Sequence, residues 1–264
     1  MTKRFRDKRV VVTGACGVFG TWIAEAFARE GATLCLTDMR AEPLEALAKR
    51  LGPGTIAHAA QLADESAVLG LAQAVAARWG APDVVVNNAG VYPRGLLLDI
   101  PVAEWDRIMN VNVRAPFIVS REMAKLMIAH GVKGAIVNIS SGAARRMRNG
   151  SAPYCISKSA VDRLTKGLAL ELAEHGIRVN AVEPGFAPGS DVSPLSETYV
   201  RKMTAGIPLQ RTSGPADAPE AILYLCSDAA SFVTGATLSV DGGNSIGTFE
   251  PGPLKQDDMR LPPR

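Results

Sequence analysis

The sequence predicts an α/β fold in which helices cover both faces of a doubly wound parallel sheet. Short apolar runs rich in β-branched residues alternate with segments of helical periodicity along most of the 264 residues. The first of these runs leads into a glycine-rich turn. Of all residues, 47% are apolar and only 5% are aromatic, which suits helices packed on a sheet. This composition excludes a disordered chain, and four cysteines are too few for a disulfide-built mini-domain.

Seven short apolar runs are predicted as strands. Each is nearly continuous in apolar residues, which is typical of strands that are buried on both faces. They cover residues 9–13, 33–37, 55–58, 83–86, 134–139, 178–182 and 237–240.

Helical periodicity fills the intervals between these runs. The predicted helices cover residues 21–30, 42–51, 65–79, 102–130, 152–175 and 217–225. Because strands and helices alternate strictly, we expect right-handed crossovers between parallel strands. No linker interrupts this pattern, so residues 1–250 are expected to form a single domain. Residues 251–264 hold four prolines without periodicity and are expected to be a loose tail, with docking on a neighbouring subunit as the alternative.

Charge and cysteine content argue against several function classes. The 29 basic and 26 acidic residues give a net charge of +3, too small for a surface that binds a phosphate backbone. Basic residues at the start of the sequence precede an uncharged run over residues 10–24, as in a secretory signal peptide. Gly14, Gly17 and Gly20 lie in that run and weaken an apolar helix there, which argues against a signal peptide. No run reaches the roughly 20 apolar residues of a membrane span. Cysteines and histidines do not cluster, so we expect a reduced, metal-free, cytoplasmic protein.

The glycine-rich turn at residues 13–20, TGACGVFG, is a candidate dinucleotide-binding loop. Glycines allow a tight turn there and let backbone N–H groups approach a pyrophosphate at the positive end of the next helix. Glycine-rich turns occur in many folds, but this one follows the first buried strand and opens a helix. The sequence therefore predicts binding of a dinucleotide at this turn.

Asp38 ends the second predicted strand, and it bears on the choice of cofactor. A carboxylate at this point accepts hydrogen bonds from the adenosine ribose hydroxyls, whereas a 2′-phosphate would meet like charge. Asp38 therefore favours NAD over NADP, although Arg40 nearby softens that repulsion. The alternative interpretation is that Asp38 only caps the following helix.

Tyr154 and Lys158 are four residues apart at the start of a predicted helix and share one face of it. Free tyrosine is a poor base at neutral pH because its pKa is near 10. An ammonium group about 4 Å away is worth roughly 4 kcal/mol at an effective dielectric constant near 20, enough to bring the pKa of the phenol toward 7. Tyr154 would then exchange a proton with an alcohol or carbonyl oxygen during hydride transfer. Taken alone, the pair is more typical of a solvated helix face.

Further motifs accompany this pair, and together they resemble the classical short-chain dehydrogenase/reductase family as far as about Gly243. In order, the matching pieces are the turn at 13–20, Asp38, Asn87-Asn88-Ala89-Gly90, Asn112, Asn138-Ile139-Ser140-Ser141, Tyr154 with Lys158, Pro184-Gly185 and Val240-Asp241-Gly242-Gly243. The joint order and spacing make this match specific. The resemblance implies a Rossmann-like sheet of seven strands, a nicotinamide dinucleotide cofactor and oxidoreductase activity.

The resemblance also implies roles for individual residues. Ser141 would hydrogen-bond the reacting oxygen, Lys158 would also bind the nicotinamide ribose, and Asn112 would interrupt its helix and hold a water that connects Lys158 to solvent. With Tyr154 as the general acid/base, these four are the predicted catalytic residues, and no metal is expected. The alternatives without a catalytic role are that Ser141 only begins a loop and that Asn112 is an exposed polar residue. The predicted cofactor-binding residues are Gly14, Gly17, Val18, Phe19, Gly20, Asp38, Gln61, Leu62, Asn88, Ala89, Gly90, Tyr154, Lys158, Pro184, Gly185 and Ala187.

Three positions depart from the family pattern. The glycine spacing is TGxxGxxG, with Val18 at the usual place of the middle glycine, which is more like the family's extended branch. Gln61 stands where many relatives carry an acidic residue or Asn near the adenine, and its amide can still hydrogen-bond there. After Pro184-Gly185 the usual threonine is missing, and either Ser190 or the backbone of Ala187 would replace it.

The segment over residues 186–207 breaks the alternation, as a substrate-covering loop does in this family. It supplies candidates for an apolar pocket beside the nicotinamide, which favours a secondary alcohol or ketone of apolar or aromatic character. These candidates are Phe186, Val192, Leu195 and Tyr199, together with Tyr92. Arg145, Arg146 and Arg148 either bind a carboxylate or a phosphate-bearing carrier, or form only a solvated loop or a subunit contact.

The leading hypothesis is an NAD-dependent alcohol dehydrogenase or ketone reductase with a small-molecule substrate. An NADP-dependent 3-oxoacyl thioester reductase of the acyl-carrier-protein type is the alternative enzyme. Phosphate groups of its cofactor and carrier could be bound by Arg40 and by Arg145, Arg146 and Arg148. A sugar epimerase of the extended branch fits the glycine spacing but needs a larger C-terminal region. A dinucleotide-sensing binding module is the non-enzymatic alternative. Family members usually assemble through long helices, so residues 102–130 and 152–175 predict a homotetramer without nucleic-acid or membrane partners.

Overall fold

Seven strands form one parallel sheet at the centre of the molecule. The computed structural model describes residues 3–189 and 194–249, and the sheet has the order β3-β2-β1-β4-β5-β6-β7. The strands are β1 (Arg9–Thr13), β2 (Thr33–Asp38), β3 (Ile56–Ala59), β4 (Val84–Asn87), β5 (Ala135–Ile139), β6 (Arg178–Pro184) and β7 (Thr237–Val240). The strand order reverses between β1 and β4, and doubly wound sheets bind their ligands at the carboxyl ends of the strands beside such a reversal.

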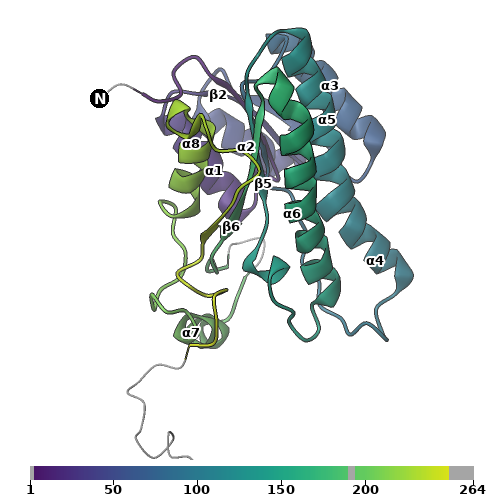
Figure 1. Cartoon of the computed structure of the whole chain (residues 1–264), viewed down its shortest axis with the longest axis vertical. Coiled ribbons are helices and arrows are strands. Elements are labelled where there is room, and N and C mark those ends of the chain that lie inside the picture. Colours follow the sequence, from purple (N-terminus) through teal and green to yellow (C-terminus); the bar gives the residue numbers. More distant parts are fainter. Residues whose placement is uncertain (1–2, 190–193, 250–264) are drawn as a thin grey trace, which may run out of the picture.

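Helices cover both faces of this sheet (Figure 1). One layer contains α1 (Val18–Arg29), α2 (Ala41–Leu51) and α8 (Ala218–Cys226), and the other contains α3 (Glu65–Trp79), α5 (Ala115–Ala129) and α6 (Ala152–Leu172). Successive residues of β1 alternate between the two cores, because Val10 and Val12 face the first layer and Val11 faces the second. Both faces need apolar side chains, which explains the continuous apolar runs. The predicted fold class is confirmed.

Helix boundaries differ from the predicted ones at three places. α1 begins at Val18, about one turn before the predicted start, because the glycine turn leads directly into it. The predicted helix over residues 102–130 is divided into α4 (Val102–Met109), a π-helical turn at Asn110–Arg114, and α5. α6 ends at Leu172, and a 3-10 turn (Ala173–His175) completes the predicted helix over residues 152–175.

The predicted substrate-covering segment contains a short helix that sequence reasoning missed. α7 (Glu197–Ala205) begins where the Ser196 hydroxyl accepts a hydrogen bond from the Tyr199 N–H at 3.3 Å. It lies beyond the carboxyl ends of the strands, apart from the two helix layers (Figure 1). The capping serine was the signal available in the sequence. Ser190, Val192 and the predicted tail at 251–264 lie outside the described residues.

A buried chain of hydrogen bonds joins the sheet to α5 and α6. The Asn87 side-chain amide donates to Ser120 Oγ and to Asn138 Oδ1, both at 2.8 Å. Asn138 donates in turn to Thr165 Oγ1 at 2.9 Å. All four side chains are buried, where leaving one donor or acceptor unpaired costs about 1–3 kcal/mol. This chain therefore holds α6 in one position against β4 and β5.

Membrane-spanning helices, disulfides and metal-binding clusters are absent from the described residues. Among the described residues, no helix has the length and the apolar character that crossing a bilayer requires. All four cysteines are free thiols. No group of three or more His, Cys, Asp or Glu side chains in the described part of the chain is arranged to hold a metal ion.

Candidate active site

The glycine turn between β1 and α1 lies at the carboxyl end of a central strand. Gly14 has a φ of 61°, and a Cβ there would lie 2.7 Å from Ala89 Cα. A Cβ on Gly20 would collide with the Gly14 carbonyl oxygen. Gly17 is the N-cap of α1, Val18 and Phe19 begin its first turn, and no described side chain caps the helix. The first N–H groups of α1 are therefore left to bind an anion such as a pyrophosphate.

The turn after β4 supports the glycine turn from the neighbouring strand. The Asn88 side-chain amide donates to the carbonyl oxygens of Thr13 at 2.9 Å and Gly14 at 3.0 Å. The Thr13 hydroxyl accepts from the N–H groups of Asn88 and Ala89, both at 3.0 Å. Asn88 and Ala89, two predicted cofactor-binding residues, thus lie directly against the turn. Sequence reasoning missed the role of Thr13, for which its place just before Gly14 was the signal.

Asp38 lies at the carboxyl end of β2, beside the same turn. Its Oδ2 accepts from the Cys16 N–H at 3.1 Å, and its Oδ1 accepts from the Arg40 N–H and Nε, each at 3.1 Å. Burial and the Asp38 charge together raise the pKa of the Cys16 thiol to about 11. Asp38 does not act as the N-cap of α2, because Arg40 holds that position. The carboxylate is therefore beside the glycine turn and partly neutralised by Arg40.

The other predicted cofactor-binding residues lie at the carboxyl ends of β3 and β6. Gln61 is exposed and Leu62 is buried, and both follow β3. Pro184 ends β6, and the Gly185 N–H donates to the Val240 carbonyl at 2.8 Å. Ala187 follows and is half-buried. These residues share one edge of the sheet with the glycine turn and Asp38.

Tyr154 and Lys158 lie on the first turns of α6, next to the end of β5. Ser141 precedes a 3-10 turn (Gly142–Ala144) that follows β5, and its hydroxyl accepts the Ala143 N–H at 3.2 Å. The Ser141 side chain also acts on Tyr154, whose pKa it lowers. The Lys158 ammonium donates to the Ile139 carbonyl at 2.7 Å and lies 5.8 Å from the centroid of the Tyr154 ring. The structure thus brings three of the four predicted catalytic residues together.

The π-helical turn between α4 and α5 positions the fourth, Asn112. Its Oδ1 accepts from the Val91 N–H and its Nδ2 donates to the Val91 carbonyl, both at 2.8 Å. Nδ2 also donates to Ser157 Oγ at 3.0 Å, and that hydroxyl donates to the Tyr154 carbonyl at 2.7 Å. Asn112 is 1% exposed, so it is not the exposed polar residue of the alternative interpretation. Its amide joins the turn after β4 to the start of α6.

Lys158 is buried beside Asn112. A Cβ on Gly90 would lie 3.4 Å from Asn112 Oδ1 and 3.6 Å from Lys158 Nζ, which places the three residues around one point. Burial lowers the pKa of Lys158 to about 8, and the charge of Asp162 opposes this shift. Gly90 thereby brings the turn after β4 into contact with both side chains.

The pKa of Tyr154 does not follow the expectation drawn from the sequence. Burial raises it above its ordinary value, and the Ser141 hydrogen bond and the Arg148 charge only reduce that rise. Lys158 does not outweigh burial, because its ammonium is bound to the Ile139 carbonyl and its own charge is disfavoured by burial. The residues of the chain therefore keep Tyr154 protonated at neutral pH.

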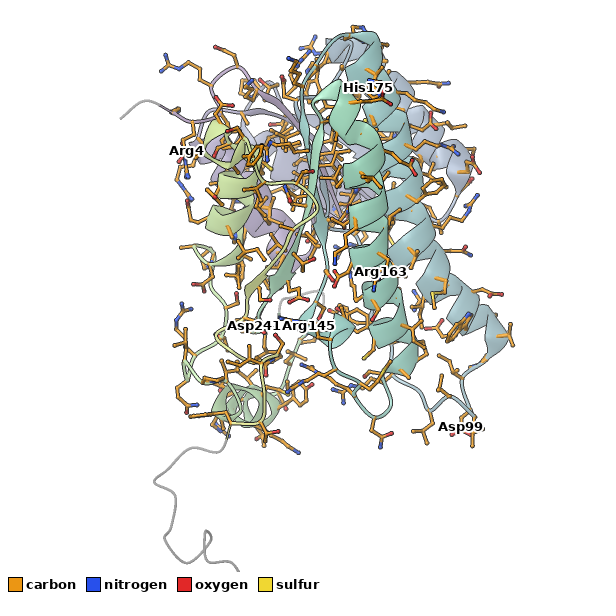
Figure 2. The ribbon with its side chains drawn as sticks, in the orientation of Figure 1. Arg4, Asp99, Arg145, Arg163, His175 and Asp241 are labelled. Carbon is orange, nitrogen blue, oxygen red and sulfur yellow. The ribbon has the colours of Figure 1, made fainter. Side chains whose placement is uncertain are left out.

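The three arginines after Ser141 have different surroundings. Arg145 pairs with the fully buried Glu183 at 2.5 Å and donates to Ser245 Oγ at 2.6 Å (Figure 2). Arg146 donates to the Gly247 carbonyl at 3.2 Å. The Nε of Arg148 is buried and has no hydrogen-bond partner among the described residues. Two of the three arginines are therefore engaged by the β6 strand and by the segment after β7.

Aromatic rings lie beside Tyr154 and on α7. Tyr92 packs edge-on against Tyr154 with ring centroids 6.4 Å apart, and Phe186 packs edge-on against Tyr199 at 6.1 Å. Arg94 donates to the Tyr199 hydroxyl at 2.7 Å and lies 5.6 Å from the centroid of that ring. Arg94 therefore ties the loop after β4 to α7, a contact that no pattern in the sequence indicated.

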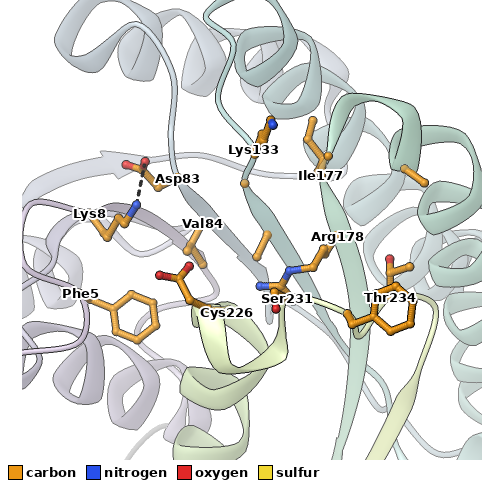
Figure 3. Close-up of a pocket in the computed structure, with 16 residues that line it drawn as sticks. Phe5, Lys8, Asp83, Val84, Lys133, Ile177, Arg178, Cys226, Ser231 and Thr234 are labelled. Atoms are coloured by element: carbon orange, nitrogen blue, oxygen red, sulfur yellow. Dashed lines mark ion pairs between the residues drawn. The ribbon is translucent and has the colours of Figure 1, made fainter.

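A cavity of about 580 Å³ lies at the opposite edge of the sheet (Figure 3). Asp83, Gly134 and Arg178 line it, at the amino ends of β4, β5 and β6. The Arg178 guanidinium is already bonded to the carbonyls of Leu225 at 2.6 Å and Ser227 at 3.1 Å. No predicted site residue lines this cavity, and doubly wound sheets bind ligands at the carboxyl ends of their strands. We therefore place the candidate site at the carboxyl edge.

Known proteins match the chain over nearly its whole length. A family model described as enoyl-(acyl carrier protein) reductase matches residues 14–245. The chain is also 36% identical over 239 residues to nodulation protein G of Rhizobium meliloti (strain 1021), covering 90% of this chain and 97% of that protein. The chain belongs to the classical short-chain dehydrogenase/reductase family.

Two further matches come from the same short-chain dehydrogenase/reductase family. Cis-4-hydroxycyclohexanecarboxylate dehydrogenase of Sinomonas cyclohexanicum is 36% identical over 247 residues, covering 92% of this chain and 98% of that protein. The crystal structure of 3-ketoacyl-(acyl-carrier-protein) reductase from Brucella melitensis, complexed with NADH, has a TM-score of 0.84 at 34% identity and covers 91% of this chain and 99% of that one. As a member of this family, the protein is an oxidoreductase that binds a nicotinamide dinucleotide.

The buried Lys158 makes the stability of the protein depend on pH in a defined window. Between its folded pKa of about 8 and its ordinary value of 10.5, Lys158 is charged in the unfolded chain but largely neutral in the folded one. The unfolded chain then binds more protons, so stability rises with pH. Relative to Lys158→Met, the wild type should gain about 2 kcal/mol of unfolding free energy between about pH 7.5 and 9.5. Urea unfolding measures this gain, and parallel profiles would contradict it.

Proposed function

We propose that this short-chain dehydrogenase/reductase is an NAD-dependent enzyme that interconverts a secondary alcohol and a ketone, with Tyr154 as the general acid/base. The observation that carries the proposal is the grouping of Ser141 and Tyr154 with Lys158 and Asn112 at the sheet edge that holds the glycine turn. The relatives support it, because one is named as a dehydrogenase of a hydroxylated ring and the other as a 3-ketoacyl reductase complexed with NADH.

The residues around the glycine turn fit a nicotinamide dinucleotide. Gly14 and Gly20 leave the turn free of side chains, and the first N–H groups of α1 are available to a pyrophosphate. Asp38 lies where a ribose is expected, and its charge favours NAD over NADP. The cofactor, when bound, accepts or donates the hydride.

The chain's own residues would hold the reacting oxygen and move its proton. Ser141 follows β5 and Tyr154 lies on the first turn of α6, so a substrate oxygen bound to both hydroxyls would exchange a proton with the phenol. Lys158 carries most of its charge at pH 7, since its pKa is about 8. The side chain of Asn112 is bonded to Val91 and Ser157, which fixes the π-helical turn at the place where the family resemblance puts the relay water.

An NADP-dependent 3-oxoacyl thioester reductase is the second candidate function. The position of Arg40 favours it, because a guanidinium beside the ribose site can bind a 2′-phosphate if it exchanges Asp38 for that group. Against it, Arg145 and Arg146 are engaged with Glu183 and Gly247 and are not free for a phosphate-bearing carrier. A dinucleotide-sensing module remains the non-enzymatic alternative, and it has no need of Tyr154.

Tyr154→Phe removes the proposed acid/base hydroxyl and keeps the ring. We expect kcat/KM to fall about 10²- to 10⁴-fold on every substrate of a panel of secondary alcohols, ketones and acyl thioesters, with NADH affinity nearly unchanged. Absorbance of the reduced cofactor, with NAD and NADP assayed separately, measures this loss. Tyr224→Phe on α8 is the matched control and should keep full activity. Undiminished turnover by Tyr154→Phe would contradict the role, whereas cofactor binding by the wild type without any turnover would favour the sensing module.

Asp38→Asn tests the preference for NAD. The substitution keeps a hydrogen-bonding side chain beside Cys16 but removes the charge that repels a 2′-phosphate and leaves Arg40 unpaired. We expect the ratio of kcat/KM for NAD over NADP to fall about tenfold or more, the size of one lost charge interaction. Glu42→Gln removes an exposed charge four residues away and should leave the ratio unchanged. An unaltered ratio in Asp38→Asn would show that the carboxylate does not select the cofactor.

We further propose a homotetramer in the cytoplasm. Apolar side chains stay exposed on the helices that the family uses for assembly, including Val102 at 76%, Phe117 at 39% and Leu170 at 82%. Contact between subunits would remove this surface from water. Free thiols at all four cysteines fit a reducing compartment. Sedimentation equilibrium should give four times the chain mass at micromolar concentration, and a monomer would contradict the proposed assembly.

A further inference from the structure

Arg148 contains a buried donor without a partner. It lies in the loop between the 3-10 turn after Ser141 and the start of α6. Its Nε is buried and makes no hydrogen bond to any described residue. Buried polar groups are nearly always paired, because an unmade hydrogen bond to a desolvated donor costs stability. The partner of this guanidinium must therefore come from outside the described part of the chain.

The backbone holds Arg148 close to the proposed reaction centre. Its carbonyl accepts the N–H of Ser151, the N-cap of α6, at 3.0 Å. The Gly150 carbonyl accepts the Gly95 N–H, also at 3.0 Å, so this loop is joined to the loop after β4. The Arg148 charge also lowers the pKa of Tyr154, in agreement with this placement.

Neighbouring charges leave Arg148 without compensation. The buried carboxylate Glu183 is paired with Arg145, and Arg146 is bonded to the Gly247 carbonyl. Arg94, on the other loop, donates to the neutral Tyr199 hydroxyl. No ion pair within the described residues involves Arg94 or Arg148. The side of the site between these loops thus carries uncompensated positive charge next to aromatic rings.

We propose that Arg148 binds a carboxylate of the substrate, so that this enzyme acts on hydroxy acids and keto acids. The inference rests on the proposed alcohol and ketone chemistry at Tyr154 and specifies its substrate class. The two terminal nitrogens of a guanidinium form a fork that matches the two oxygens of a carboxylate. The phosphate of an acyl carrier is many bonds from its reacting carbon, whereas Arg148 lies in the short loop that leads from Ser141 into the start of α6. A short anionic substrate fits this placement better.

Ligand binding tests the proposal without requiring turnover. Cyclohexanecarboxylate and its neutral carboxamide are titrated by calorimetry into the NADH-saturated wild type, Arg148→Gln, Arg148→Lys and Arg146→Gln. We expect the carboxylate to bind the wild type and to bind Arg148→Gln about 10- to 100-fold more weakly, the size of a charge-assisted hydrogen bond. Arg148→Lys should restore part of the affinity, and Arg146→Gln should bind as the wild type does. The carboxamide should not distinguish the four proteins.

Kinetics then separate substrate recognition from a structural effect. With keto acids and their methyl esters as matched pairs, Arg148→Gln should raise KM for the acid about 10- to 100-fold, with little change in kcat, and should leave the ester unaffected. Equal losses on acid and ester, or equal carboxylate binding by the wild type and Arg148→Gln, would overturn the proposal. A wild type that binds the carboxylate through Arg148 but turns over no substrate would refute the proposed function and leave this site standing. Turnover that depends on Tyr154 but shows no preference for acids would support the proposed function and refute the carboxylate site at Arg148.

Discussion

The close contact between the turns after β1 and β4 is the constraint on which the candidate site depends. Gly14 lies against Ala89 with no room for a side chain, and the Asn88 amide is bonded to the Thr13 and Gly14 carbonyls. The next residue, Gly90, lies against Asn112 and Lys158. The proposed cofactor turn and the proposed proton-transfer residues are therefore linked through a single four-residue turn. A side chain at Gly14 would push them apart.

Burial positions the ionisable groups of the site and also decides their protonation. Lys158 is held by the Ile139 carbonyl in a dry environment, which lowers its pKa, and the same lack of water raises the pKa of Tyr154. The tyrosine is not tuned by the lysine alone, because desolvation of the phenolate outweighs an ammonium 5.8 Å from the ring. The chain thus presents Tyr154 as a proton donor, and the Ser141 hydrogen bond favours its ionised form.

Helix α6 carries Tyr154 and Lys158, and three sets of contacts fix it. The buried chain from Asn87 to Thr165 joins α6 to the sheet, and the Asn112 amide joins its first turn to the loop after β4 through Ser157. The loop before it is anchored by Arg145 on the buried Glu183. With that loop anchored, Arg148 remains the arginine whose buried nitrogen has no partner in the described chain.

The sequence by itself determined the features that depend on local patterns. Alternating apolar runs and helical periods predicted the parallel sheet, the glycine turn predicted its own place before α1, and the spacing of Tyr154 and Lys158 put both on one helix face. These features follow from backbone preferences and side-chain periodicity within a few residues. The resemblance supplied the remaining candidate residues, and the structure places them along one edge of the sheet.

Features that depend on contacts between residues far apart in the sequence were decided only by the tertiary structure. The family resemblance implied that Asn112 interrupts its helix, but no local pattern encodes the contact behind the break, which is the bond of Asn112 to Val91, 21 residues earlier. The partners of Arg145, Arg146 and Arg148 differ although the three are close in sequence, since they come from β6, from the segment after β7 and from no described residue. The pKa of Tyr154 depends on how much water the folded chain excludes. The helix break, the partners of the three arginines and the pKa of Tyr154 are therefore all set by packing between segments far apart in the chain.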